Sequence, residues 1–185
     1  MSIVGKRRRA RELALQFLYQ CDMNPPSAFC HGESSPDAES GGAVTPQGRD
    51  AAVDGVDENG MISSDHIEEA IDDFWRSFKT DSDVKSFFTV LVAGTYRHLD
   101  EIDRVINDTS KNWKLDRMAV VDRNIIRSAV FELIYLSDIP PSVTINEAIE
   151  IAKRYGTEDS PGFINGILDR IADEYSDQNL KQVPS

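Results

Sequence analysis

Five of the six residues from position 6 to position 11 are cations, and they form the strongest chemical signal in the sequence. They are Lys6, Arg7, Arg8, Arg9 and Arg11. Ammonium and guanidinium groups bind phosphate oxygens, and arginine adds bidentate hydrogen bonds and stacking on unpaired bases. Tyr19 follows Arg11 by about two helical turns, so its ring could stack on a base beside the cations. The cluster therefore predicts a site for a polyanion, with a solvated, frayed helix end as the alternative.

The sequence offers no comparable signal for catalysis or for a metal. It contains no phosphate-binding loop, no His-Glu-x-x-His and no nucleophile elbow. The histidines His31, His66 and His98 have no partner at the spacing of zinc ligands, and Cys21 and Cys30 do not form a Cys-x-x-Cys pair. We therefore expect a non-enzymatic binding protein without a metal or cofactor, whose cysteines are free thiols in a reducing compartment.

Charge is distributed unevenly along the chain, whose net charge is −12. Residues 24–65 hold eight acids and one base, a net charge of −7, together with four of the eight prolines and six of the eleven glycines. Such a composition buries too little apolar surface to offset the entropy of ordering. We predict an acidic, disordered insert at 24–65. It is either a tolerated surface insertion, a screen for the basic cluster or a binding segment of its own.

The remaining sequence predicts an all-α fold, because apolar residues recur at helical spacing and no stretch alternates long enough for a strand. We expect one compact bundle of about seven helices. The basic arm and first helix occupy 1–23, the other helices occupy 66–178, and 179–185 is a polar tail. Gly94 is expected to allow two helices to approach closely. The expected N-caps are Asp65, Asp81, Asp100, Asp116, Thr144 and Ser160, with Gly156 in a left-handed conformation at a helix end.

Two helices with a tight corner between them are predicted over residues 140–171, where Pro140 and Pro141 bar a helix from running through. Asn146, Asn165 and Asp159 are polar residues that the predicted caps do not explain. A structural hydrogen bond is the plainer interpretation of each. No apolar run in the chain approaches the roughly 20 residues of a membrane span, so we expect a cytoplasmic protein.

Five blocks of the chain form a pattern when taken together: Gly5–Gln16, Val121–Leu133, Ile145–Lys153, Glu158–Ser160 and Phe163–Asp169. In combination these blocks resemble the NusB family of transcription antitermination factors. The blocks follow one another in the family's order, and the resemblance covers most of the chain except residues 24–65. The resemblance implies the family's compact helical bundle. Members of the family join their first two helices by a much shorter connection, so the insert departs from the pattern.

The resemblance also implies a function. In this family the arginine-rich N-terminus binds the boxA element of nascent ribosomal RNA, and the corner carrying Asp159 and Phe163 belongs to the same surface. Phe163 is then a stacking candidate, although its spacing fits core packing equally well. A small-subunit ribosomal protein, called NusE in this role, is the implied protein partner, and the matching positions are Asp116 and Arg117. The complex joins RNA polymerase and lets it read through terminators.

Two other functions remain open at this point. The chain could be a helical adaptor that binds protein and not RNA. It could also be a detached version of the NusB-like domain that some ribosomal RNA cytosine methyltransferases carry, although it contains no methyl-donor motif. Members of the family are monomers or homodimers, and no apolar stripe in the sequence decides between the two states.

Overall fold

The computed structural model describes residues 3–23, 64–76, 79–110 and 114–180, and within these ranges the chain is helical without a strand. The expected all-α fold is confirmed. Residues 24–63 of the predicted acidic insert and residues 181–185 of the predicted polar tail lie outside the described residues. Ser64 and Asp65, predicted as the end of the insert, lie in the first turn of a helix, so Asp65 is not the N-cap expected of it. The elements are α1 (Ile3–Met23), α2 (Ser64–Arg76), α3 (Ser82–Arg97), α4 (Leu99–Thr109), the 3₁₀ helix η2 (Leu115–Arg117), α5 (Val120–Tyr135), α6 (Pro141–Tyr155) and α7 (Ser160–Leu180).

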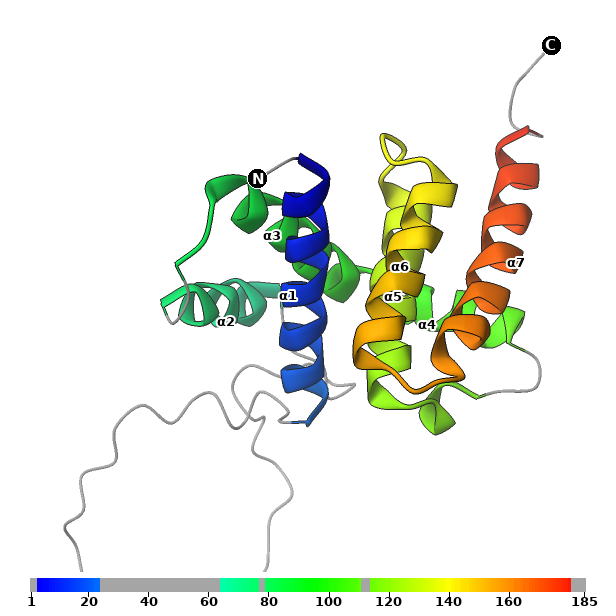
Figure 1. Cartoon of the computed structure of the whole chain (residues 1–185), viewed down its shortest axis with the longest axis horizontal. Coiled ribbons are helices and arrows are strands. Elements are labelled where there is room, and N and C mark those ends of the chain that lie inside the picture. Colours follow the sequence, from blue (N-terminus) through cyan, green and yellow to red (C-terminus); the bar gives the residue numbers. More distant parts are fainter. Residues whose placement is uncertain (1–2, 24–63, 77–78, 111–113, 181–185) are drawn as a thin grey trace, which may run out of the picture.

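Helix α1 stands in the middle of the bundle, where α3 crosses behind it and α5 and α6 stand on one side of it (Figure 1). Helix α2 packs on α3, and α7 packs on α4, α5 and α6. Helices α1 and α6 run side by side in the same direction, and the α6–α7 corner lies at the end of the molecule where α1 finishes (Figure 1). Among the described helices, none is both long and apolar enough to cross a membrane.

The inner side of α1 belongs to the apolar core. Its Phe17 ring packs edge-on against Phe74 and Phe88, with centroids 5.5 and 5.7 Å away, and those two rings stack on each other at 5.2 Å. Leu13 is also buried. Burial of large apolar side chains is the main stabilising contribution in a small domain, so α1 cannot leave the bundle without a large loss of stability. The side chains on its outer side are therefore held on a fixed backbone.

Gly94 permits the close contact that its position predicts. A Cβ atom added to Gly94 would lie 2.0 Å from Cζ of Phe131, far inside van der Waals contact. Helices α3 and α5 meet at this point. The expected close approach of two helices is confirmed.

The predicted helix ends are partly wrong. Asp81 does cap α3, because its Oδ1 accepts the Asp83 N–H at 3.0 Å. Helix α4 starts at Leu99, however, which leaves Asp100 in its first turn, and Asp116 lies in η2 before α5 begins at Val120. Both aspartates still lie near a helix N-terminus, where the helix dipole favours a negative charge.

The start and end of α6 also differ from prediction. Pro141 fits the first turn of a helix, so α6 begins there and Thr144 lies inside it, with a buried hydroxyl that donates to Glu132 at 3.3 Å. Gly156 has φ −91°, which is not left-handed. Its lack of a side chain serves close packing instead, because a Cβ atom would lie 2.6 Å from Oγ of Ser160. Glycine here permits a tight corner.

Candidate nucleic-acid interface

The first two cations of the cluster have different surroundings. Lys6 bridges α1 to the start of α3, with Nζ 2.9 Å from Asp81 and 2.7 Å from Asp83. Hydrogen bonds to Asp83 and then to Asp81 raise the pKa of Lys6, so it remains charged. Arg7 is more open. Its guanidinium lies over the Phe87 ring at 5.2 Å, and its contact with Asp138 is long at 3.4 Å. Arg7 is thus available to a phosphate, whereas Lys6 would first have to release its carboxylates.

Arg8 and Arg9 are partly exposed, and each is anchored by a carboxylate at the base of the surface. Arg8 donates from Nε and Nη2 to the two oxygens of Glu147 on α6, at 2.9 and 2.6 Å. Arg9 donates from Nη1 to Glu12 at 3.1 Å. A guanidinium carries five N–H donors in a rigid fork. The anchored arginines therefore keep donors for an incoming phosphate while their positions are restrained.

Arg11 lies inside the bundle, which differs from the expectation of a phosphate contact. Only 6% of its side chain is exposed, against 2% for its partner Glu132 on α5, and the two form hydrogen bonds of 2.7 and 2.6 Å. The helical period explains the difference: α1 has neighbours on both flanks, so a side chain three residues past Arg8 points into a contact between helices. The structure gives Arg11 the surroundings of a residue that joins α1 to α5.

Arg154 is an exposed cation that sequence reasoning missed. It lies in the last turn of α6 with 64% of its side chain exposed, and its Nη1 is 2.6 Å from Oε1 of Glu12 on α1. The guanidinium also lies over the ring of Tyr155, at 5.2 Å from the centroid. A cation at a helix C-terminus is expected from the dipole alone, so the sequence gave no reason to assign it to a site.

The remaining predicted RNA contacts lie toward the other end of α1. Tyr19, in the last turns of α1, is an exposed aromatic side chain. At the α6–α7 corner Asp159 is exposed, and Phe163 is partly buried against the edge of the core. Buried Ser160 closes the corner by accepting the Thr157 N–H at 2.9 Å. The structure thus places a basic group at the start of α1 and an aromatic group, Tyr19 and Phe163, at the end of α1 and the start of α7.

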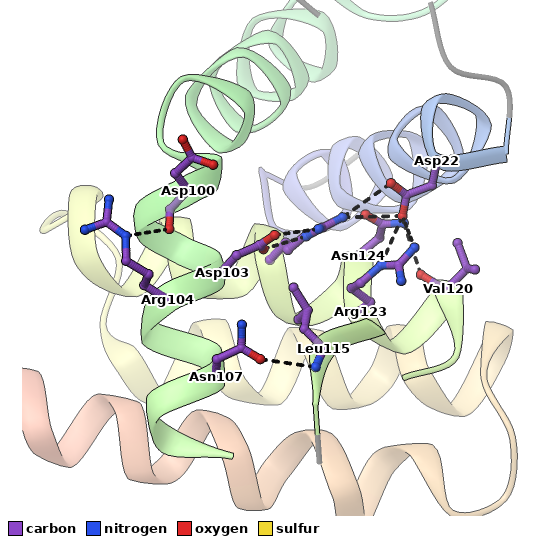
Figure 2. Close-up of polar contacts among 10 residues, drawn as sticks. Asp22, Asp100, Asp103, Arg104, Asn107, Leu115, Val120, Arg123 and Asn124 are labelled. Atoms are coloured by element: carbon purple, nitrogen blue, oxygen red, sulfur yellow. Dashed lines mark hydrogen bonds and ion pairs between the residues drawn. The ribbon is translucent and has the colours of Figure 1, made fainter. Parts of the chain in front are cut away.

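The predicted partner-binding residues Asp116 and Arg117 are exposed on η2. The surrounding elements are fixed by polar contacts that Figure 2 shows: Asn107 of α4 accepts the N–H of Leu115 at 3.2 Å, and Asp22 at the end of α1 binds Arg123 and Asn124 of α5. Further along α5, Arg127 joins Asp22 to Asp103 of α4. These contacts tie α1, α4 and α5 together.

One buried group near η2 has unused hydrogen-bonding capacity. Oδ1 of Asp122, in the first turn of α5, has no hydrogen-bond partner among the described residues. A buried carboxylate oxygen without a partner is costly to stability. Elsewhere among the described residues, no group of three or more His, Cys, Asp or Glu side chains could hold a metal ion.

The family model of the NusB family matches residues 46–173. The chain belongs to the NusB family. It is 45% identical over 175 residues to the transcription antitermination protein NusB of Geotalea daltonii, covering 95% of this chain and 99% of that relative. NusB of T. maritima has a similar structure, with a TM-score of 0.62, 32% identity and 91% of each chain covered.

The fold is also shared with the antitermination factor NusB in a crystal structure of NusB and NusE with double-stranded RNA. That likeness has a TM-score of 0.60 at 24% identity and covers 92% of this chain and 98% of the other. At this identity it shows a common NusB fold.

Proposed function

We propose that this NusB-family protein is a non-enzymatic RNA-binding factor of transcription antitermination, which binds boxA-type RNA in ribosomal RNA transcripts together with NusE. The observation that carries the proposal is the row of partly exposed arginines on α1, a helix whose inner side is core. Relatives that share nearly half of their residues with this chain are named transcription antitermination proteins. The proposal includes action in the cytoplasm, where nascent transcripts are made.

In this proposal the residues divide the work of binding RNA. Arg7, Arg8 and Arg9 bind phosphates, which supplies affinity without base specificity. Tyr19 and Phe163 stack on unpaired bases, whose faces the aromatic rings match. Asp159 accepts hydrogen bonds from base N–H groups, since a carboxylate repels phosphates and has only acceptors. Arg11 acts indirectly by holding α1 on α5, and Lys6 contributes after it releases Asp81 and Asp83.

The protein partner belongs to a separate surface in this proposal. Exposed Asp116 and Arg117 on η2 would bind NusE, and the complex would then join the RNA polymerase antitermination machinery. Support comes from the solved NusB–NusE–RNA complex of the same fold. The mass of the protein in solution distinguishes a monomer from a homodimer.

Filter-binding titration of boxA-type RNA against a scrambled RNA, with and without NusE, tests the function. If Lys6 and the three exposed arginines neutralise about four phosphates of single-stranded RNA, the log of affinity falls against log salt with a slope of roughly −3. Replacing Arg7, Arg8 and Arg9 with Ala should flatten this slope by about 2, weaken both RNAs and leave NusE binding intact. An unchanged affinity and slope would refute the arginine site.

Phe163→Ala tests the aromatic group separately. Because Phe163 is only partly buried, we expect a stability loss below the roughly 3–5 kcal/mol of a core Phe, together with a loss of about 1–3 kcal/mol in RNA binding. A full core-type loss of stability with unchanged RNA affinity would remove Phe163 from the site.

A protein-only adaptor is the second candidate, and the net charge of −12 favours it, because a strongly acidic protein repels RNA. The same titration decides between the two candidates. An adaptor would bind NusE with an affinity that does not depend on RNA and would retain neither boxA nor scrambled RNA on the filter.

A further inference from the structure

One buried carboxylate joins two exposed arginines from different helices. Glu12 of α1 accepts a hydrogen bond from Nη1 of Arg9 at 3.1 Å on its Oε2 and from Nη1 of Arg154 at 2.6 Å on its Oε1. Arg154 is in the last turn of α6, which runs beside α1 (Figure 1). Two guanidinium groups that are far apart in the sequence are thus held side by side by the two oxygens of a single acid.

The three residues of this cluster, Glu12, Arg9 and Arg154, differ in how deeply their side chains are buried. The Glu12 side chain is 8% exposed, whereas that of Arg9 is 41% exposed and that of Arg154 is 64% exposed. The negative charge therefore lies beneath two positive charges that face solvent. An approaching anion meets the guanidiniums before it meets the carboxylate.

The charge of the cluster differs from that of the neighbouring ion pairs. Arg11 and Glu132 pair one to one, as do Arg8 and Glu147, although Arg11 also approaches Glu147 at 3.7 Å. Glu12, by contrast, serves two arginines, which leaves one positive charge in excess. Each arginine donates to Glu12 from Nη1 alone, so its other N–H groups remain available as donors. A guanidinium is rigid and planar, and its geometry matches that of a phosphate.

We propose that Arg9 and Arg154 form a clamp for one phosphate group of bound RNA, with Glu12 as the residue that positions both guanidiniums. This inference rests on the proposed RNA-binding function and extends it from α1 to α6. The clamp supplies a contact between the basic group at the start of α1 and the α6–α7 corner that follows Arg154. A continuous path for one RNA strand then runs along α1 and the end of α6.

The first test is the salt dependence of RNA binding by Arg154→Gln. A clamp that holds one phosphate contributes about 0.7 to the slope of log affinity against log salt. Losing that contact should therefore weaken RNA binding about fivefold at 0.1 M salt. Arg76→Gln is the matched control, since Arg76 is an exposed arginine in an ion pair with Asp73 on α2, a helix that packs on α3. The control should change affinity less than about twofold and leave the slope unchanged.

A double-mutant cycle tests whether the two arginines act on the same phosphate. Arg9→Gln and Arg154→Gln should each lose the contact, so that the double variant flattens the slope by about 0.7 and not by twice that amount. Two independent phosphate contacts would give additive losses and would overturn the clamp.

Glu12→Gln tests whether Glu12 positions the two guanidiniums or only reduces the positive charge near them. The variant removes one negative charge, so long-range electrostatics alone would raise RNA affinity. If Glu12 positions the arginines, affinity should instead fall by about threefold or more, and Arg154→Gln should then have little additional effect. Thermal melts of each variant check that the fold is retained.

The outcomes separate this inference from the proposed function. If the parent binds RNA and loses affinity on replacement of Arg7 and Arg8, while Arg154→Gln behaves like Arg76→Gln, the clamp is wrong and the proposed function stands. If the parent retains no RNA, both are wrong. A slope change specific to Arg154 and Arg9, with sub-additive loss, supports the clamp.

Discussion

Neighbouring arginines on α1 have opposite surroundings. Arg8 is partly exposed and anchored to Glu147, whereas Arg11, less than one turn further on, is buried in an ion pair with Glu132. Removing one partner of a buried ion pair leaves an uncompensated charge, which costs far more than the loss of an exposed pair. The two residues should therefore respond very differently to substitution.

Arg11→Met should lower the free energy of unfolding by about 3–5 kcal/mol, because it leaves the Glu132 carboxylate buried without its partner. Urea denaturation monitored by circular dichroism measures the change. Arg7→Met is the control, and it should stay within about 1 kcal/mol of the parent. Adding Glu132→Leu to Arg11→Met should restore part of the loss, and failure to do so would point to a packing role for Arg11.

Cys21 should be an unreactive thiol, because burial raises its pKa from 9.0 to about 11. The raised pKa also makes stability depend on pH: the unfolded thiol ionises first, so stability is full below about pH 9 and is lost as pH rises toward 11. At about 1.4 kcal/mol per unit, the loss is roughly 2–3 kcal/mol. Alkylation rates and melts of a Cys30→Ser background, with and without Cys21→Ala, measure both effects. Rapid alkylation at pH 8 would contradict the prediction.

The sequence singled out the N-terminal cations as a predicted site but did not indicate which of them face solvent. That distinction depends on α5 and α6, which supply Glu132 and Glu147 from positions more than 120 residues away in the chain. Arg154 was missed for the same reason, since its neighbour Glu12 is distant in sequence. Periodicity reports which side of a helix is apolar, but it does not report which polar side chains a second helix will cover.

At the scale of the elements, apolar spacing predicted the helices better than the cap residues predicted their ends. A hydroxyl or carboxyl side chain caps a helix only where the preceding chain is not already helical. Pro141 starts α6 before Thr144 is reached, and the 3₁₀ turn η2 takes up Asp116 before α5 begins. Helix α6 therefore starts earlier than its predicted hydroxyl cap, whereas α5 starts later than its predicted carboxyl cap.

Replacing Gly94 or Gly166 with Ala should change the free energy of unfolding in opposite directions. Gly94→Ala should lower the free energy of unfolding by about 1–3 kcal/mol or more, because its Cβ would lie 2.0 Å from the Phe131 ring. Gly166→Ala on α7 meets no atom within 4 Å and should raise stability by up to about 1 kcal/mol. Denaturant midpoints of the two variants measure the difference. Equal effects would contradict the close approach of α3 and α5.

At the scale of the whole molecule, charge is distributed unevenly along the chain. Residues 24–65 carry a net charge of −7, while exposed arginines gather along α1 and the end of α6. The segment follows directly from α1, so its charges add to the field that an approaching RNA meets. At 0.1 M salt, exposed charges more than about 10 Å apart are largely screened from each other. The repulsion between this segment and RNA should therefore be strongest in dilute buffer.

Deleting residues 26–62 and closing the gap with a short Gly/Ser link should leave the cooperative melt nearly intact, because loop closure changes by only about 1 kcal/mol. RNA affinity should stay equal or rise, most of all at low salt. A full-length variant with the acids of 33–58 changed to their amides separates charge from length. Loss of the cooperative transition would show that the segment contributes to the core.

The burial of one side of α1 has a consequence for proteolysis. A basic segment in a loose terminal arm is an ideal substrate for trypsin, yet here the bonds after Arg9 and Arg11 lie in a helix that also carries Leu13 and Phe17 of the core. Cleavage at these bonds should therefore rise with urea in step with global unfolding. A rate independent of urea would reveal local opening of α1. On this prediction, a protease removes the basic residues of α1 only after the molecule has unfolded.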